Sequence, residues 1–154
     1  MEARMTHPVF AVPAALKALS AYSQAGKGLG VPAETIEMIN LRASQINGCS
    51  VCVQLHSNNL KKEGISDERL YAVAAWRDAP YFTDAERVAL ELTELVTRVA
   101  DRGDPVPDDV WAEAERHYDE QGLSALLIAI TSIRARDSSM ARAQASSGKS
   151  AGRG

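Results

Sequence analysis

The sequence predicts an all-α fold, a single-domain helical bundle of about six or seven helices. Apolar residues recur at intervals of three and four along most of the chain, which is the period of a helix with one buried face. The alternation of β-branched and polar residues that is typical of strands is absent. Glycines and prolines divide the chain into segments of helical length, and several segments begin with a capping residue.

Three helices are predicted in the first part of the chain. The first covers residues 9–24, the second begins at Pro32 and ends at Gly48, and the third runs from about Cys49 to Gly64. The second and third helices then form a helix-turn-helix that carries a Cys-x-x-Cys motif. The apolar positions that support the first two helices are Val12, Leu16, Leu19, Ile36, Ile39, Ala43 and Ile46.

The next two helices have capping signals at their starts. Ser66 can cap a helix over residues 67–77, and Pro80 prevents this helix from continuing far. The run Thr83-Asp84-Ala85-Glu86 is a capping-box sequence, so a further helix begins there. Its expected buried face consists of Val88, Leu92, Leu95, Val96 and Val99.

Two more helices complete the predicted bundle. One begins at Asp108 or Asp109 and ends near Tyr118, and a long helix follows Gly122. The long helix has buried positions at helical spacing, which are Leu126, Ile130 and Ile133.

The composition is typical of one soluble domain. Of the 154 residues, 45% are hydrophobic and 24% are charged, so residues 1–145 can form one helical domain with its own core. Residues 146–154 cannot bury a core, and we expect them to be a disordered tail. No apolar run is long enough for a membrane span and no signal-peptide pattern is present, so a cytoplasmic location is expected. The net charge of −3 argues against a nucleic-acid partner, although basic residues gather from Arg134 onward.

The residues that carry chemistry gather in one short stretch. Cys49, Cys52 and His56 are spaced i, i+3 and i+7, which places them on one face of a helix. At the start of a helix, free backbone N–H groups and the helix dipole stabilise a thiolate. His56 lies one turn after Cys52 and can exchange a proton with it. The stretch therefore predicts an activated thiol redox site.

Glu37 is a candidate fourth member of the site. If the second and third helices pack antiparallel across the turn at Gly48, Glu37 and His56 reach similar heights, because both helices rise about 1.5 Å per residue. Glu37 could then orient His56 or relay its proton. Two alternatives stay open: a metal ion held by Cys49, Cys52, His56 and Glu37, or cysteines that only pack.

The combination of these residues resembles a known family. The pattern is Glu37, then Ser44-Gln45-Ile46-Asn47-Gly48-Cys49-x-x-Cys52-x-x-x-His56, followed by Ala74-Ala75-Trp76-Arg77 and Pro80-Tyr81-Phe82-Thr83. It resembles the alkylhydroperoxidase D-like (AhpD-like) branch of the carboxymuconolactone decarboxylase-like family, over roughly residues 30–130.

The resemblance implies an all-α homo-oligomer, trimer-based or a dimer or hexamer, that reduces peroxides. Its implied catalytic residues are Cys52, Cys49, His56 and Glu37. Cys52 attacks the peroxide and becomes a sulfenic acid, and Cys49 condenses with it to a disulfide. Glu37 and His56 form the proton relay. An external dithiol protein then reduces the disulfide, and no cofactor or metal is required.

The last helix departs from the family pattern. Relatives typically continue with an Asn-Ala-Trp-Asn-like segment, whereas this chain has Arg134-Ala135-Arg136-Asp137, so we expect altered packing or an altered subunit interface. Two other functions therefore stay open: a thiol–disulfide oxidoreductase or redox sensor with little peroxide turnover, and a non-enzymatic oligomeric binding protein on the same fold. A lactone decarboxylase is less favoured, because that chemistry does not need a Cys-x-x-Cys pair.

Overall fold

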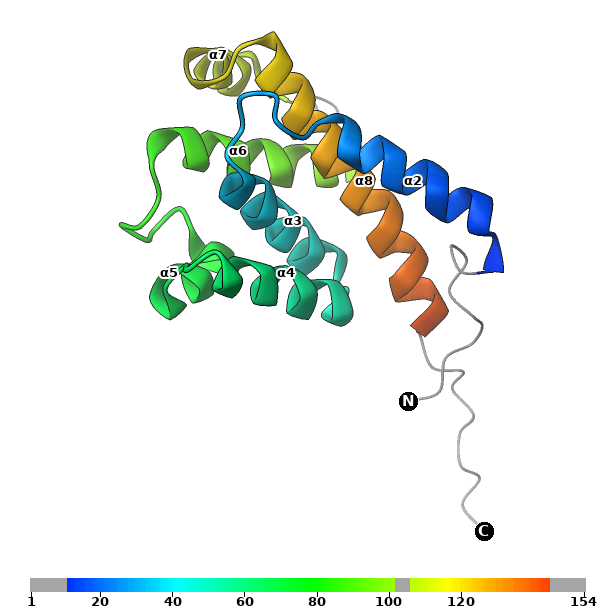
Figure 1. Ribbon diagram of the computed structural model, residues 1–154. Coiled ribbons are helices and arrows are strands. Elements are labelled where there is room, and N and C mark those ends of the chain that lie inside the picture. Colours follow the sequence, from blue (N-terminus) through cyan, green and yellow to red (C-terminus); the bar gives the residue numbers. More distant parts are fainter. Residues whose placement is uncertain (1–10, 102–105, 145–154) are drawn as a thin grey trace.

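The computed structural model describes the backbone of residues 11–101 and 106–144 and the side chains of residues 11–100 and 106–137 (Figure 1). These residues form seven α-helices and two short 3-10 helices, with no strand among them, which confirms the all-α class. In chain order the elements are α2 (Pro13–Ala25), α3 (Ala33–Asn47), α4 (Ser50–Lys62), α5 (Asp67–Ala72), η1 (Val73–Ala75), α6 (Asp84–Thr97), η2 (Val99–Asp101), α7 (Asp108–His117) and α8 (Glu120–Gln144). The tail expected at residues 146–154 lies outside the described residues.

Helix α3 lies at the centre of the bundle, where it packs against α4, α6 and α8. Its side chains Met38 and Ile39 are fully buried and belong to one hydrophobic core with Leu90 of α6 and Leu126 and Ile130 of α8. Burying one such side chain stabilises the fold by about 1.5–3 kcal/mol. Helix α2 lies beside α8 at the outside of the bundle (Figure 1). None of its residues is buried, so the central core supplies most of the stability.

Glu94 on α6 is an ionic link between three parts of the bundle. Its carboxylate accepts hydrogen bonds from Arg42 Nε of α3 at 2.8 Å and from Trp76 Nε1, just after η1, at 2.9 Å. Arg77 Nη1 donates to the other oxygen at 2.7 Å. Burial opposes ionisation of Glu94, but these three donors outweigh it and lower the pKa of Glu94 to about 2.

The start of α8 and the end of α6 differ from the positions that the sequence predicts. Helix α8 begins at Glu120, so Gly122 lies inside this helix rather than before it. Asp119 provides the start signal, because its Oδ1 accepts a hydrogen bond from the backbone N–H of Gly122 at 2.8 Å. Helix α6 ends at Thr97, and Val99, expected on its buried face, is 36% exposed in η2.

The capping signals in the middle of the chain act as the sequence predicts. The Thr83 side chain accepts from the backbone N–H of Glu86 at 3.2 Å, and the Glu86 carboxylate accepts from the backbone N–H of Thr83 at 2.9 Å. Ser66 caps α5, but the helix expected over residues 67–77 changes to a 3-10 turn after Ala72. Within residues 11–101 and 106–144, no helix has both the length and the apolar character needed to cross a lipid bilayer.

Candidate functional site

A glycine in the left-handed conformation turns the chain between α3 and α4. Gly48 has a φ of 70° and is the C-cap of α3. The backbone N–H of Cys49 donates to the carbonyl of Ser44 at 3.1 Å, which closes the end of the helix. A side chain at this φ is strained, so glycine permits the tight turn. The turn brings Cys49 to the residue immediately before α4.

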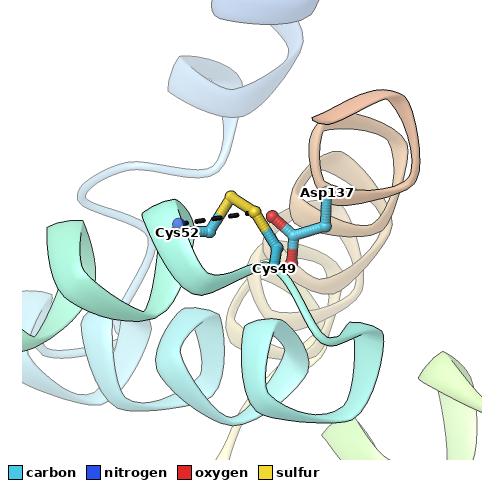
Figure 2. Close-up of side chains that lie close together, drawn as sticks. All are labelled: Cys49, Cys52 and Asp137. Carbon is cyan, nitrogen blue, oxygen red and sulfur yellow. Dashed lines mark hydrogen bonds between the residues drawn. A yellow bond between two sulfur atoms is a disulfide. The ribbon is translucent and has the colours of Figure 1, made fainter. Parts of the chain in front are cut away.

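Cys49 and Cys52 form a disulfide at the start of α4 (Figure 2). Cys49 is the N-cap residue, and its sulfur accepts a hydrogen bond from the backbone N–H of Cys52 at 3.4 Å. The pair is almost enclosed by protein, since Cys49 is 1% exposed and Cys52 is 5% exposed. When the pair is reduced, the first turn of α4 can stabilise a thiolate here through its free N–H groups.

His56 and Glu37 meet across the α3–α4 hairpin. Nδ1 of His56 lies 2.8 Å from Oε2 of Glu37, and the side chain of His56 is buried. Asn59, one turn further along α4, donates to the same Glu37 oxygen at 3.2 Å. In the tautomer that donates from Nδ1 to Glu37, Nε2 of His56 is an acceptor, and it has no partner in the structure. The pair therefore presents a nitrogen that can take up and return a proton.

The charge state of Glu37 results from opposing effects. Burial disfavours its charged form, but the hydrogen bonds from His56 and Asn59 favour it, and so do the charges of His56 and Lys27. The balance lowers the pKa of Glu37 below its usual value. Glu37 is therefore a carboxylate at neutral pH, which is the form that can hold a protonated His56.

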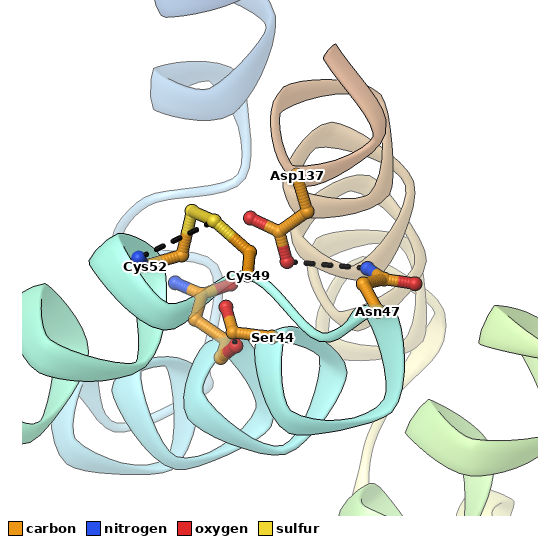
Figure 3. Close-up of a disulfide and its surroundings, with 6 residues drawn as sticks. Ser44, Asn47, Cys49, Cys52 and Asp137 are labelled. Carbon is orange, nitrogen blue, oxygen red and sulfur yellow. Dashed lines mark hydrogen bonds between the residues drawn. A yellow bond between two sulfur atoms is a disulfide. The ribbon is translucent and has the colours of Figure 1, made fainter. Parts of the chain in front are cut away.

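Asp137 enters the site from α8, at a position that sequence reasoning noted only as part of an altered helix. Its carboxyl group points toward the disulfide (Figure 2), and one of its oxygens and the two sulfurs all lie within 4.8 Å of one another. Asn47 Nδ2 donates to Oδ2 of Asp137 at 3.1 Å (Figure 3), whereas Oδ1 has no partner. The spacing of four residues from the buried Ile133 was the signal that could have placed Asp137 on the inner face.

A small cavity leads to the proton relay. It has a volume of about 150 Å³ and lies between α2, α3, α4 and α8. Glu37, His56 and Asn59 line it together with two basic residues, Lys27 and Arg136, while neither cysteine does. A small polar molecule can therefore reach the His56–Glu37 pair through this cavity.

The structure brings together the residues that the sequence singled out, in two adjoining groups. One group is the cysteine pair with Asp137, and the other is His56 with Glu37. Among the described residues, the only three potential metal-binding side chains with atoms within 4.8 Å of one another are Cys49, Cys52 and Asp137. The metal site considered from the sequence, which includes His56 and Glu37, is therefore not assembled.

Comparison with known sequences places this site in a family. Residues 13–95 match the Carboxymuconolactone decarboxylase family. The chain is 31% identical to the uncharacterised protein YdfG of Bacillus subtilis over 121 residues, which is 79% of this chain and 81% of that protein. It is also 34% identical to the uncharacterised protein YnjA of Escherichia coli over 102 residues, which is 64% of this chain and 54% of that protein.

Solved structures show the same arrangement of helices. A protein of unknown function from Agrobacterium tumefaciens, proposed to be the antioxidant defence protein AhpD, superposes with a TM-score of 0.85 at 28% identity. The match covers 94% of this chain and 97% of that one. The debrominase Bmp8 shares the fold with a TM-score of 0.75 at 16% identity, over 86% of this chain and 70% of that one. The chain thus belongs to the carboxymuconolactone decarboxylase family, in its alkylhydroperoxidase D-like branch.

Proposed function

We propose that this protein is a thiol-dependent alkylhydroperoxidase-like antioxidant enzyme. The observation that carries the proposal is the disulfide between Cys49 and Cys52 at the start of α4, one turn before a buried histidine held by a carboxylate. A cysteine pair that can be bridged and reduced supplies two electrons, and the relay supplies the proton exchange. Family membership and the likeness to a proposed AhpD protein support the same chemistry.

In the proposed reaction, Cys52 is the attacking sulfur because His56 follows it by one helical turn. His56 takes the Cys52 proton and Glu37 stabilises the imidazolium. The thiolate attacks the distal peroxide oxygen, so the S–O bond forms and the O–O bond breaks. The departing alkoxide takes the proton from His56 and leaves as an alcohol, with Cys52 as a sulfenic acid.

The second half of the cycle uses Cys49. Its sulfur attacks the sulfur of Cys52, the S–S bond forms, and the hydroxyl group leaves as water. An external dithiol protein then exchanges its thiols with the disulfide and regenerates both cysteines. The organic peroxide and the dithiol donor are thus the two partners that we propose, and the protein needs no further cofactor for these steps.

The test is peroxide consumption by the purified protein with dithiothreitol as reductant, using hydrogen peroxide and cumene hydroperoxide. We expect Cys52→Ser to abolish turnover, because serine cannot be oxidised in this way. His56→Gln should lower the rate by about a hundredfold or more, the usual contribution of a general base. His117→Gln is the matched control, because His117 also contacts a carboxylate, that of Glu113 at 3.0 Å, but lies on the surface of α7.

Two outcomes would contradict the proposal in different ways. Disulfide exchange with dithiothreitol but no peroxide consumption would favour a thiol–disulfide oxidoreductase or redox sensor. A wild-type protein equal to the Cys49→Ser/Cys52→Ser double variant in both assays would leave only a binding role for the fold.

A further inference from the structure

An acidic residue of the last helix, α8, lies at the cysteine pair, far along the chain from the Cys-x-x-Cys motif. Asp137 of α8 is fully buried, and its Oδ1 has no hydrogen-bond partner although it lies inside the protein. Its carboxyl group points toward the disulfide, within 4.8 Å of both sulfurs (Figure 2). An unpaired carboxyl oxygen at such a place destabilises the fold, because it has lost its hydrogen bonds to water without gaining others. Packing alone therefore gives no reason for an acid here.

We propose that Asp137 is a catalytic proton-exchange group that serves Cys49, as His56 serves Cys52. This inference rests on the proposed redox function of the cysteine pair. The relay formed by His56 and Glu37 then acts on the attacking sulfur, and Asp137 acts on the sulfur that closes and opens the disulfide.

The burial of Cys49 is the first reason. Cys49 is 1% exposed, so water cannot readily take the proton of its thiol or return one to its thiolate. His56 follows Cys49 by seven residues along α4 and is already paired with Glu37 at 2.8 Å. Asp137 is the acid whose oxygen lies close to this sulfur, so it is the group placed to exchange the proton.

The way in which Asp137 is held is the second reason. Asn47, at the end of α3, donates to Oδ2 at 3.1 Å and fixes one side of the carboxyl group (Figure 3). Ser44, also in view there, donates its hydroxyl hydrogen to the carbonyl of Asn40 at 2.8 Å. Oδ1 of Asp137 has no hydrogen-bond partner in the structure, so it can accept a hydrogen bond from a thiol once the disulfide is reduced.

The charged groups around Asp137 allow both proton states. Burial raises the pKa of the Asp137 carboxyl above its usual value. The hydrogen bond from Asn47, the nearby hydroxyl group of Ser44, and the positive charges of His56 on α4 and Arg136 on α8 oppose this rise. A raised pKa keeps this carboxyl group protonated at higher pH than an ordinary aspartate, so it can donate a proton as well as accept one.

Asp137 exchanges one proton with Cys49 when the disulfide forms and when it is reduced. In oxidation, the Asp137 carboxylate takes the proton of the Cys49 thiol, and the thiolate attacks the sulfenic sulfur of Cys52. The S–S bond forms, the S–O bond breaks, and the leaving hydroxide takes the proton from Asp137 as water. Before reduction, Asp137 takes up a proton from the solution. A donor thiolate then attacks Cys52, the bond between the donor sulfur and Cys52 forms, the bond between Cys49 and Cys52 breaks, and the departing Cys49 thiolate takes the proton of the Asp137 carboxylic acid. The second thiol of the donor attacks the mixed disulfide and releases Cys52.

The reduction step gives a test that does not need peroxide activity. The rate constant for reduction of the disulfide by dithiothreitol, corrected for the thiolate fraction of dithiothreitol, is measured against pH for wild-type protein and Asp137→Asn. Asparagine keeps the shape of the side chain but cannot donate an acidic proton. At about pH 5 we expect the variant to be at least tenfold slower, and its corrected rate to be independent of pH. The wild-type rate should fall as the pH rises and Asp137 loses its proton.

The direction of the effect at low pH decides between proton transfer and simple charge repulsion. If Asp137 only repels the incoming thiolate, Asp137→Asn reacts as fast as the wild type at about pH 5 and faster at high pH, and the inference is overturned. Asp108→Asn is the control, because it removes the same charge from the exposed start of α7. Its pH profile should match that of the wild type.

A measurement on the unmodified protein complements the variant. At about pH 5, an infrared difference spectrum between the oxidised and reduced forms should show that the band of a protonated, buried carboxyl group is lost and a carboxylate band is gained when the thiol of Cys49 appears. A spectrum with no carboxyl change between the two forms contradicts the inference. If the wild type fails to consume peroxide, the proposed function fails, while the dithiothreitol profile and this spectrum still decide the role of Asp137.

Discussion

At the scale of single residues, the site contains two carboxyl groups whose pKa values are shifted in opposite directions, the half-buried Glu37 and the buried Asp137. Glu37 has its charge stabilised by His56, Asn59 and Lys27, and its pKa is lowered despite burial. Asp137 is more deeply buried, and burial raises its pKa although Asn47 and Ser44 oppose the rise. Carboxyl groups whose surroundings separate their pKa values in this way are suited to different proton-transfer roles.

The raised pKa of Asp137 predicts how stability depends on pH. The unfolded chain ionises this carboxyl near its ordinary value of 3.8, whereas the folded protein keeps it protonated to higher pH. Ionisation therefore favours the unfolded state, and stability is lost as the pH rises from the unfolded toward the folded pKa. We expect Asp137→Asn to be more stable than the wild type at pH 7 and equally stable at about pH 3, measured as the urea midpoint. A variant that is less stable at both pH values would contradict this reasoning, which does not depend on proton transfer.

At the scale of helices, the turn between α3 and α4 brings Glu37 into contact with His56. Gly48 has a φ of 70°, and a Cβ atom added there would meet no atom within 4 Å. The cost of Gly48→Ala is therefore conformational rather than steric, about 1–2 kcal/mol. We expect Gly48→Asn to cost less, because asparagine tolerates this conformation. Thermal unfolding of both variants tests the order, and equal losses would mean that the backbone conformation is not the cause.

Glu94 of α6 forms ion pairs and hydrogen bonds with residues of α3 and of the segment after η1. Its folded-state pKa of about 2 lies below the usual value of 4.5, so its contribution to stability is complete above pH 4.5 and is lost as the pH falls toward 2. We expect Glu94→Gln to destabilise the protein by about 2 kcal/mol at pH 7, after allowance for solvent screening, and by much less near pH 2. Urea denaturation at the two pH values measures the difference. Glu91→Gln is the control, since Glu91 contacts only the more exposed side of Arg77 at 3.4 Å.

For the whole molecule, the family resemblance predicts a homo-oligomer. Several large apolar side chains are exposed, among them Leu16 and Tyr22 on α2 and Val12 just before it. We expect light scattering at micromolar concentration to give a mass that is a multiple of 16.6 kDa, with a trimer-based assembly as the first candidate. A mass that stays at the monomer value over a wide range of concentration would contradict this prediction. The altered last helix would then be the first place to look for the loss of the subunit interface.

Local signals in the sequence predicted much of the fold. The capping box at Thr83 and the stop at Gly48 both lie where the sequence indicated, because capping depends on residues only three or four positions apart. The sequence predicts the start of α8 wrongly, because Gly122 is typical of a helix break whereas Asp119 caps the helix before it. Val99 was expected to be buried, but the helix ends at Thr97, which repetition of apolar residues alone does not reveal.

Residue spacing along one or two helices is enough to predict the cysteine pair, the position of His56 on the same helix face, and the all-α class. Only the tertiary structure brought Asp137 to the disulfide, since 85 residues separate it from Cys52 and helix spacing says nothing about which distant helix packs on which. The 2.8 Å contact between His56 and Glu37 could be predicted from the sequence in part. The sequence could predict it only on the assumption that α3 and α4 pack together, and the packing of the hairpin supplied that condition.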